Sequence, residues 1–323
     1  MPPDAGSLVD THAHFVTADY VAAAQAAGSE VPDQMSAWPT WSAAEHLALM
    51  DECGVARSVL SISSPGVYFG NTDDATDLAR AVNETASSLQ REHPQRFGFF
   101  ASLPLPDVDA AVREAVRALD ALGAAGFCLM SNTGGMYLGD RSIEPLWRLL
   151  HDREAVVFVH PTAPPNAEQV SPTRPYPMLE FIFDEARTVA DLLFADVLER
   201  HPGIRFVISH SGGALPVLME RMDLFYGNAD VAGRADRAGK LRTLLSQLWF
   251  DCAGTPLPHA LPALVAAVGT ERLLFGSDYC FTRPKVVAQH ARRLNEDEVP
   301  WLDLMTTAGE RLFQQHLSSG DRE

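Results

Sequence analysis

The sequence predicts one domain, residues 1–323, folded as an α/β (β/α)8 barrel of the TIM type. Eight short apolar runs recur along the chain, amphipathic helical patterns separate them, and several of the runs end on histidine or aspartate. Strand and helix alternating eight times is typical of a parallel sheet that closes into a barrel. The length is ordinary for such a domain, and no segment resembles a linker between domains.

The predicted strands are mostly apolar throughout, as expected of strands that are covered on both faces. In chain order they span residues 8–12, 57–63, 97–103, 126–130, 155–160, 205–210, 247–252 and 272–276.

The predicted helices carry apolar residues at helical spacing. The clearest is 107–122, where Asp107 or Asp109 can cap the start and Gly123 can end the helix. The same kind of pattern predicts helices at 179–201, 214–225, 258–268 and 297–317.

Two long insertions follow predicted strands, on the side where a barrel keeps its active site. Residues 15–42 contain several aromatic side chains, and residues 161–178, after the fifth strand, contain six prolines. Proline stiffens a loop and denies it regular strand pairing. We expect 161–178 to be either a lid over the barrel mouth or a dimer contact.

Composition narrows the classes of partner. Hydrophobic residues make up 46% of the chain, enough for a large core, and the net charge of −17 argues against nucleic acid or an anionic membrane as a partner. The chain has no signal-type N-terminus and no apolar run of membrane-spanning length. Its four cysteines are widely spaced and predict free thiols. We therefore expect a cytoplasmic protein.

Five metal-ligand residues stand at the ends of predicted strands. His12 and His14 flank one residue in the first strand, His160 and His210 end the fifth and sixth, and Asp278 follows the last. The C-terminal strand ends of a barrel point into one mouth, so these side chains can converge on a single divalent metal ion. A buried pair of imidazoles on one strand face is costly unless something binds them.

Simpler explanations exist for each residue alone. A single histidine after an apolar run is more often a core residue, and an aspartate after a strand is often a turn cap. The remaining histidines lie elsewhere: two precede proline at the opposite end of the barrel (His93 and His201), and five in helical stretches are expected on the surface (His46, His151, His259, His290 and His316).

The two lysines, Lys240 and Lys285, do not end an apolar strand. A carbamylated lysine that bridges two metal ions is therefore not expected, and a mononuclear centre is favoured.

Four motifs resemble those of the amidohydrolase superfamily, in the branch of amino-carboxymuconate-semialdehyde decarboxylase. They are D-T-H-A-H, V-F-V-H-P, I-S-H-S-G-G-A-L-P and F-G-S-D-Y, and they span residues 10–279. Segments 61–66 and 103–107 are most similar to 6-methylsalicylate and related aromatic-acid decarboxylases.

The resemblance implies that His12, His14, His160 and Asp278 coordinate one Zn²⁺ or Mn²⁺ ion. It also implies that His210 lies beside the metal as an acid, a base or a water-orienting group, and that the protein is a homodimer. The 307–313 segment and the absence of an arginine near residue 46 depart from the family pattern and leave the identity of the substrate open.

The function predicted on this basis is metal-dependent, non-oxidative decarboxylation of a small carboxylic acid, hydroxybenzoate-like or muconate-like. The metal would bind the carboxylate and an ortho oxygen, and His210 or Asp278 would help to protonate the ring carbon. The substrate contacts expected from residues after strands are Phe15, Tyr68, Phe69, Tyr279 and Phe281 around the ring, with Arg174, Arg187 and Arg283 as carboxylate ligands.

Two alternatives remain. A hydrolase or hydratase, such as a lactonase or amidase, would use the same ligands to attack an electrophilic carbon with a metal-bound hydroxide. A barrel that only binds its ligand is the other alternative, and the intact ligand set argues against it.

Overall fold

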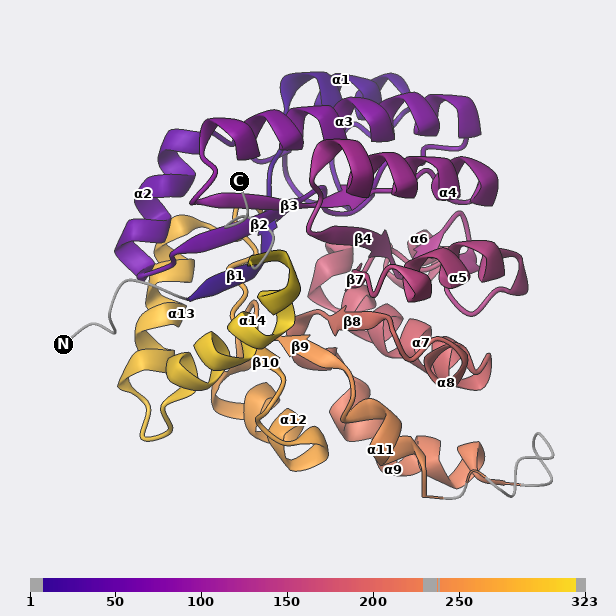
Figure 1. The fold of residues 1–323 in the computed structure, drawn as a ribbon, viewed down its shortest axis with the longest axis vertical. Coiled ribbons are helices and arrows are strands. Elements are labelled where there is room, and N and C mark those ends of the chain that lie inside the picture. The colour runs from indigo at the N-terminus through magenta and orange to yellow at the C-terminus, as the bar shows by residue number, and fades with distance from the viewer. Residues whose placement is uncertain (1–7, 229–236, 238, 318–323) are drawn as a thin grey trace.

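Eight parallel strands form one sheet in the computed structural model, which describes residues 8–228, 237 and 239–317. Figure 1 shows these strands at the centre of the molecule. They pair in the order β1-β2-β3-β4-β7-β8-β9-β10. Their bounds are Val9–His14, Arg57–Ser61, Phe97–Ser102, Gly126–Met130, Val156–His160, Arg205–Ile208, Trp249–Asp251 and Leu273–Leu274. The backbone N–H of Thr11 donates to Phe275 O at 3.0 Å, which joins the first strand to the last. The predicted (β/α)8 barrel is confirmed.

Helices surround the strands in the order expected of a barrel (Figure 1). Those that follow or precede strands are α1 (Ala18–Ala26), α2 (Ala43–Cys53), α3 (Thr72–Glu92), α4 (Val108–Arg117), α5 (Glu144–Asp152), α6 (Ala167–Val170), α7 (Glu180–Phe194), α8 (Val197–Arg200), α9 (Leu215–Tyr226), α11 (Leu241–Leu245), α12 (Leu261–Val268), α13 (Pro284–Glu296) and α14 (Trp301–Leu317). A small hairpin, β5 (Asn132–Thr133) with β6 (Met136–Tyr137), follows β4.

The predicted helix ends are correct where caps define them and wrong where the backbone breaks. Asp107 accepts a hydrogen bond from the N–H of Ala110 at 2.9 Å and so caps α4, and the helical path ends at Gly123. The helix expected over 179–201 is two helices, because Asp196 takes a left-handed conformation with φ 61°. The last helix begins at Trp301 instead of residue 297, since Pro300 disfavours a helical conformation at the residue before it.

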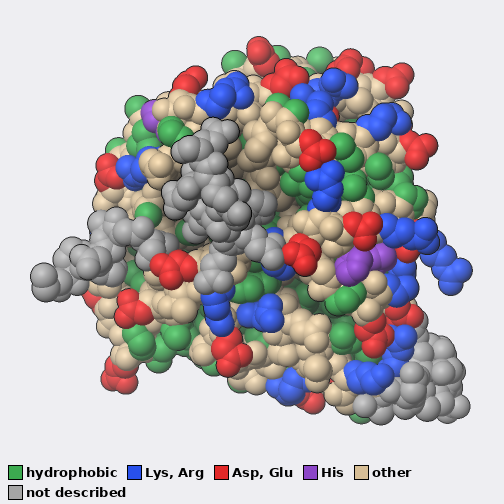
Figure 2. Space-filling model, viewed as in Figure 1, with side chains coloured by type: hydrophobic (Ala, Val, Ile, Leu, Met, Phe, Trp, Pro, Cys, Tyr) green, Lys and Arg blue, Asp and Glu red, His purple; other side chains and the backbone are tan. Residues whose placement is uncertain are grey.

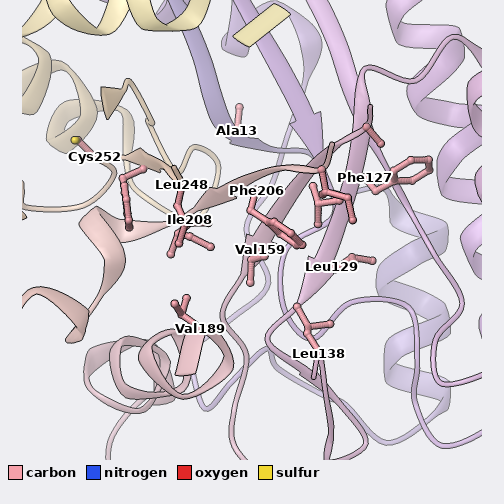
Figure 3. Packing of buried hydrophobic residues seen from close by; sticks show 14 of the residues in the cluster. Ala13, Phe127, Leu129, Leu138, Val159, Val189, Phe206, Ile208, Leu248 and Cys252 are labelled. Atoms are coloured by element: carbon pink, nitrogen blue, oxygen red, sulfur yellow. The ribbon is translucent and has the colours of Figure 1, made fainter. Parts of the chain in front are cut away.

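The core has two parts. A large outer part packs the strands against the helices, and Figure 3 shows Phe127, Val159 and Ile208 within it, near Val189 of α7. A smaller part contains one or two side chains from each of several strands, together with Leu312 and Phe313 of α14. This second cluster is a layer of side chains that fills the barrel, because alternate residues of a strand point inward.

His46 and His290, expected on the surface, are buried instead. His46 is only 1% exposed and accepts a hydrogen bond from Trp41 Nε1 at 3.0 Å. His290 bonds Cys252 O at 3.1 Å. Polar residues lie on both faces of α2 and α13, so helical spacing alone does not distinguish the buried face from the exposed one. A histidine that is buried with a hydrogen-bond partner is therefore not predicted.

The surface is charged and mixed in sign. On the face seen in Figure 2, Lys and Arg side chains are interspersed with Asp and Glu. Pairs such as Arg153 with Asp120, 2.7 Å apart, are exposed and contribute little to stability. Within the described residues, no helix combines the length and apolar character needed to cross a bilayer.

Candidate metal centre

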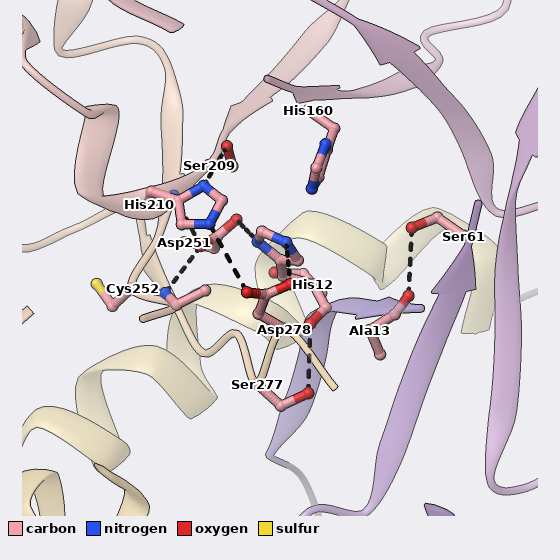
Figure 4. A network of polar contacts seen from close by, with 12 residues as sticks. His12, Ala13, Ser61, His160, Ser209, His210, Asp251, Cys252, Ser277 and Asp278 are labelled. Atoms are coloured by element: carbon pink, nitrogen blue, oxygen red, sulfur yellow. Dashed lines mark hydrogen bonds and ion pairs between the residues drawn. The ribbon is translucent and has the colours of Figure 1, made fainter. Parts of the chain in front are cut away.

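His12, His14, His160 and Asp278 meet at one end of the barrel, where each offers a ligand atom and all four atoms lie within 4.8 Å of one another. His12 and His14 come from β1, His160 ends β7, and Asp278 follows β10. Figure 4 shows most of this group from close by. Ligands placed about 2.0–2.2 Å from one ion lie roughly 3–4 Å apart, so the cluster has the size of a mononuclear site.

Hydrogen bonds hold the three rings by their Nδ1 atoms. The partners are Asp251 Oδ2 for His12 at 2.9 Å, Ser61 Oγ for His14 at 3.0 Å and Pro161 O for His160 at 2.7 Å. A carbonyl oxygen only accepts, and the Ser61 hydroxyl already donates to Ala13 O. Each Nδ1 therefore carries the hydrogen, which leaves the Nε2 lone pair free to bind a metal ion.

The Nε2 atoms of His12 and His14 are buried and have no hydrogen-bond partner. Asp278 Oδ1 lies 3.5 Å from the first and 3.4 Å from the second. Two buried, unpartnered ring nitrogens facing one carboxylate oxygen are costly without a ligand between them. A divalent ion fits this site, because nitrogen from imidazole and oxygen from carboxylate are the ligands that Zn²⁺ and Mn²⁺ accept.

Asp251 supports the centre from behind, and the sequence analysis missed it. It ends β9, is fully buried, and its Oδ1 accepts hydrogen bonds from the backbone N–H of His210 at 3.1 Å and Ala253 at 2.9 Å. Burial would raise the pKa of Asp251, but the charge and hydrogen bond of His12 outweigh burial and hold that pKa below its usual value. The sequence feature that points to Asp251 is a carboxylate inside the otherwise apolar run Leu-Trp-Phe-Asp-Cys.

His210 lies beside the four ligands. Its Nδ1 is 3.0 Å from Ser209 Oγ, its Nε2 is 4.0 Å from Asp278 Oδ2, and its ring centre is 4.8 Å from that of His12. Burial, followed by the charge of His12, lowers the pKa of His210 to about 4. His210 and Asp278 both have positive φ, 49° and 55°. Non-glycine residues held there by their surroundings are concentrated at functional sites.

A cavity of about 420 Å³ opens onto His160, His210 and Asp278. Its walls are mainly apolar and come from both insertions and from the segments after the strands: Met35, Pro177, Met178, Phe181, Ile182 and Phe281. The two insertions are joined, because the Tyr176 N–H donates to Asp33 O at 3.0 Å and Gln34 Nε2 donates to Tyr176 Oη at 2.7 Å. The Pro-rich segment thus borders the cavity, and its action as a lid stays a prediction.

Of the aromatic residues expected around a substrate, Phe281 lines this cavity and the others do not. Phe15 is buried against Trp41, with ring centres 6.0 Å apart, and Tyr279 is packed on His46 at 4.9 Å. Phe15 directly follows His14, which ends β1 and points into the barrel, so Phe15 points the other way. Tyr68 and Phe69 line hollows elsewhere on the molecule.

The arginines expected to hold a carboxylate are likewise away from the cavity. Arg174 pairs with Glu180 at 2.9 Å, and Arg187 pairs with Asp184 at 2.5 Å. Arg283 precedes α13 and is exposed. Residue type and position after a strand do not reveal that an arginine is already paired with a neighbouring acid.

The chain is similar to a known protein family over most of its length. The family model described as amidohydrolase matches residues 9–299. The 6-methylsalicylic acid decarboxylase of Aspergillus aculeatus is 31% identical over 308 residues, which cover 92% of this chain and 92% of that relative.

Solved structures share the fold. One called amidohydrolase II superposes with a TM-score of 0.87 at 29% identity, covering 95% of this chain and 100% of that one. A dihydroxybenzoic acid decarboxylase from Polaromonas sp. JS666, described with bound manganese and the inhibitor 2-nitroresorcinol, superposes with a TM-score of 0.83 at 20% identity, covering 98% and 100%.

Proposed function

Because the chain belongs to the amidohydrolase family, we propose that it is a metal-dependent, non-oxidative decarboxylase of a hydroxybenzoate-like acid. The observation that carries this proposal is the His12, His14, His160 and Asp278 group at the floor of a mainly apolar cavity of about 420 Å³. Pockets of this size hold small organic ligands and use a few polar groups to orient them. The curated relative from Aspergillus aculeatus acts on 6-methylsalicylic acid, which is such an acid.

The cofactor is a divalent metal ion, and we assign His12, His14, His160 and Asp278 as its ligands. When bound, such an ion would orient the substrate carboxylate and would stabilise negative charge that develops on the substrate. The manganese of the Polaromonas enzyme supports Mn²⁺, and the same nitrogen and oxygen donors accept Zn²⁺.

Decarboxylation breaks the bond between the ring carbon and the carboxylate. Carbon dioxide leaves, the bonding electron pair stays on the ring carbon, and that carbon takes a proton. We assign to His210 the transfer of this proton from water to the ring carbon, because a neutral imidazole can take up a proton and pass it on. Its ring borders the cavity, whereas Asp278 directs Oδ1 at His12 and His14 and is proposed as a ligand. Positioned proton transfer of this kind typically contributes 10²–10⁴-fold to a rate.

The surroundings of His210 suit that role. Ser209 Oγ holds its Nδ1, and its backbone N–H donates to Asp251, so the ring keeps one orientation. Its Nε2 lies 4.0 Å from Asp278 Oδ2. The apolar side chains of Phe181, Ile182 and Phe281 line the same cavity and offer a surface on which an aromatic ring can pack.

The test is to offer purified, metal-loaded protein a panel of salicylate-type acids and to measure carbon dioxide and the phenol product. We expect equal amounts of the two from at least one acid. A hydrated or ring-opened product without carbon dioxide would instead support the hydrolase or hydratase alternative.

We further propose that the protein is a homodimer. Large apolar side chains are exposed just before α7 and along α9, including Met178 at 71%, Val217 at 77% and Leu224 at 72%. Exposed apolar patches on adjacent helices are typical of protein interfaces. Size measurement by sedimentation tests this, with a monomer as the contradicting result.

Two broader expectations also stay proposals. We propose that residues 1–323 act as one catalytic domain, supported by the family match over 9–299. We also propose a cytoplasmic location, supported by four cysteines that are all free.

A further inference from the structure

One charged side chain of the cavity has no part in the mechanism above. Apart from histidines, the charged residues among the described residues that line the cavity are Asp278, assigned to the metal, and Asp33. No lysine or arginine is among the lining residues that the structure describes. A cavity for an organic acid thus presents a second carboxylate and, besides the metal site, no cation.

The backbone on either side holds Asp33 in place. Its carbonyl oxygen accepts from the Tyr176 N–H at 3.0 Å, and the next residue, Gln34, bonds the Tyr176 hydroxyl at 2.7 Å. Pro32, just before, is buried and lines the same cavity. Asp33 itself has φ 49°, a conformation that aspartate and asparagine tolerate better than most residues. These backbone contacts fix residue 33 in the wall of the cavity.

The Asp33 carboxylate shares the cavity lining with Ser63 and lies next to Ser64, which is buried and does not line the cavity. Burial raises its pKa to about 6, and a hydrogen bond from Ser64 opposes this rise. Ser63 also lines the cavity, and its Oγ is 3.4 Å from His160 Nε2. Ser63 and Ser64 therefore connect the Asp33 side of the cavity to the metal group, and the cavity lies in front of Asp33 and Ser63.

A half-buried carboxylate with no cationic partner among the described residues is a strong acceptor for a hydrogen-bond donor. A hydroxyl or amino group on a bound ring satisfies it with a charge-assisted bond. A second carboxylate placed there faces Asp33 with no positive charge nearby, and like charges held together without a cation repel. The same residue thus favours one substituent and rejects another.

We propose that Asp33 is a specificity-determining residue that binds a hydroxyl or amino substituent on the ring and excludes acids that carry a second carboxylate in its place. This proposal rests on the proposed function, because it describes the substrate of the same site. The substrate class is then a monocarboxylic hydroxybenzoate that carries a donor group away from the reacting carboxylate.

The experiment compares salicylates that differ in one substituent. Hydroxyl, methoxy and carboxylate are placed in turn para to the reacting carboxylate, and then meta to it, and kcat/KM is measured for the metal-loaded wild type, Asp33→Asn and Glu30→Gln. Asparagine tolerates the positive φ of residue 33, so the variant changes charge with little change in shape. Glu30 is an exposed acid of the same insertion and serves as the matched control.

At one of the two ring positions, we expect the kcat/KM of the wild type to be about tenfold higher for the hydroxyl compound than for the methoxy compound, because the methoxy compound loses a hydrogen bond to a charged group. The kcat/KM for the carboxylate compound should be lower still. Asp33→Asn should reduce the hydroxyl preference several-fold and raise the relative rate with the dicarboxylate. Glu30→Gln should match the wild type. The proposal is overturned if the ratios of kcat/KM between substrates are equal in the wild type and in Asp33→Asn. It is also overturned if the wild type accepts the dicarboxylate as well as the hydroxyl compound.

Dissociation constants for the same ligands, measured by calorimetry on metal-loaded protein, separate this proposal from the proposed function. If binding depends on Asp33 but no carbon dioxide is released, the decarboxylase proposal is refuted and the Asp33 proposal is supported. If carbon dioxide is released but binding does not depend on Asp33, the decarboxylase proposal is supported and the Asp33 proposal is refuted. Failure of every compound to bind overturns the Asp33 proposal as well.

Discussion

His12 Nδ1 lies 2.9 Å from Asp251 Oδ2, and both residues are fully buried. This contact places the hydrogen of the ring on Nδ1 and turns Nε2 toward Asp278. The same carboxylate holds the backbone N–H of His210 through its other oxygen. One aspartate therefore orients both a proposed ligand and the proposed proton donor.

Asp251→Asn should weaken metal binding about 10–100-fold, as expected when a residue that orients a ligating histidine is lost. Asparagine keeps the size of the side chain, but it removes the negative charge that supports His12. Metal affinity, measured by competition with a chelator, checks this. Asp120→Asn changes a surface acid and should leave the affinity as in the wild type; an Asp251→Asn protein with wild-type affinity would show that the contact is only structural.

His210→Asn should lower kcat by about 10²–10⁴-fold while the protein keeps its metal, because we place His210 outside the ligand set. Asp278→Asn should instead lose metal. Turnover and metal content measured on the same samples distinguish the two roles. Loss of metal from His210→Asn would make His210 a ligand and contradict the assignment.

Gly276→Ala should disturb the centre. A Cβ at this position would lie 2.8 Å from His12 Cβ and 3.0 Å from both Ala253 Cβ and Asp251 Oδ1, so these groups must move. We expect a loss of about 1–3 kcal/mol in the free energy of unfolding and weaker metal binding. Gly309→Ala, whose Cβ would meet Val9 at an ordinary 3.5 Å, is the control and should not lose stability by this mechanism. Equal effects in both variants would refute the close approach at Gly276.

The buried imidazole of His46 should make the protein sensitive to acid. Burial, followed by the charges of His14 and Arg96, lowers the pKa of His46 to about 3. The folded state then keeps His46 neutral while the unfolded chain takes up a proton below about 6.5. This contribution to stability is full above pH 6.5 and is lost as the pH falls from there toward 3, on the order of a few kcal/mol in total. Thermal unfolding of the wild type and of His46→Gln across this range checks it: the variant should show a shallower decline, and an identical pH slope would contradict the account.

Much of the fold and of the site follows from local patterns. Apolar runs that end on His160 or precede Asp278 are visible in the sequence, and barrel topology alone brings their ends together. Gly276, just before Asp278, has no side chain, and the structure uses this for a close approach, since an added Cβ would lie 2.8 Å from His12 Cβ.

The other parts of the site could not be predicted from local patterns, because they depend on contacts between residues distant in the sequence. Asp251 looks like a strand residue until His12, distant in sequence, is seen to bond it. Phe15 and Phe281 are both aromatic residues near a ligand, and only the direction of each side chain separates the one in the core from the one in the cavity. Asp33 is in a loop whose position is fixed by Tyr176 of the other insertion, and no local pattern reports that contact.

The most direct measurement is carbon dioxide release from a salicylate-type acid before and after removal of the metal, with elemental analysis of the same samples. We predict one equivalent of divalent metal per chain, loss of activity with the metal, recovery on adding Mn²⁺ or Zn²⁺, and neither metal nor activity in His12→Ala. Undiminished release of carbon dioxide by metal-free protein would contradict the account.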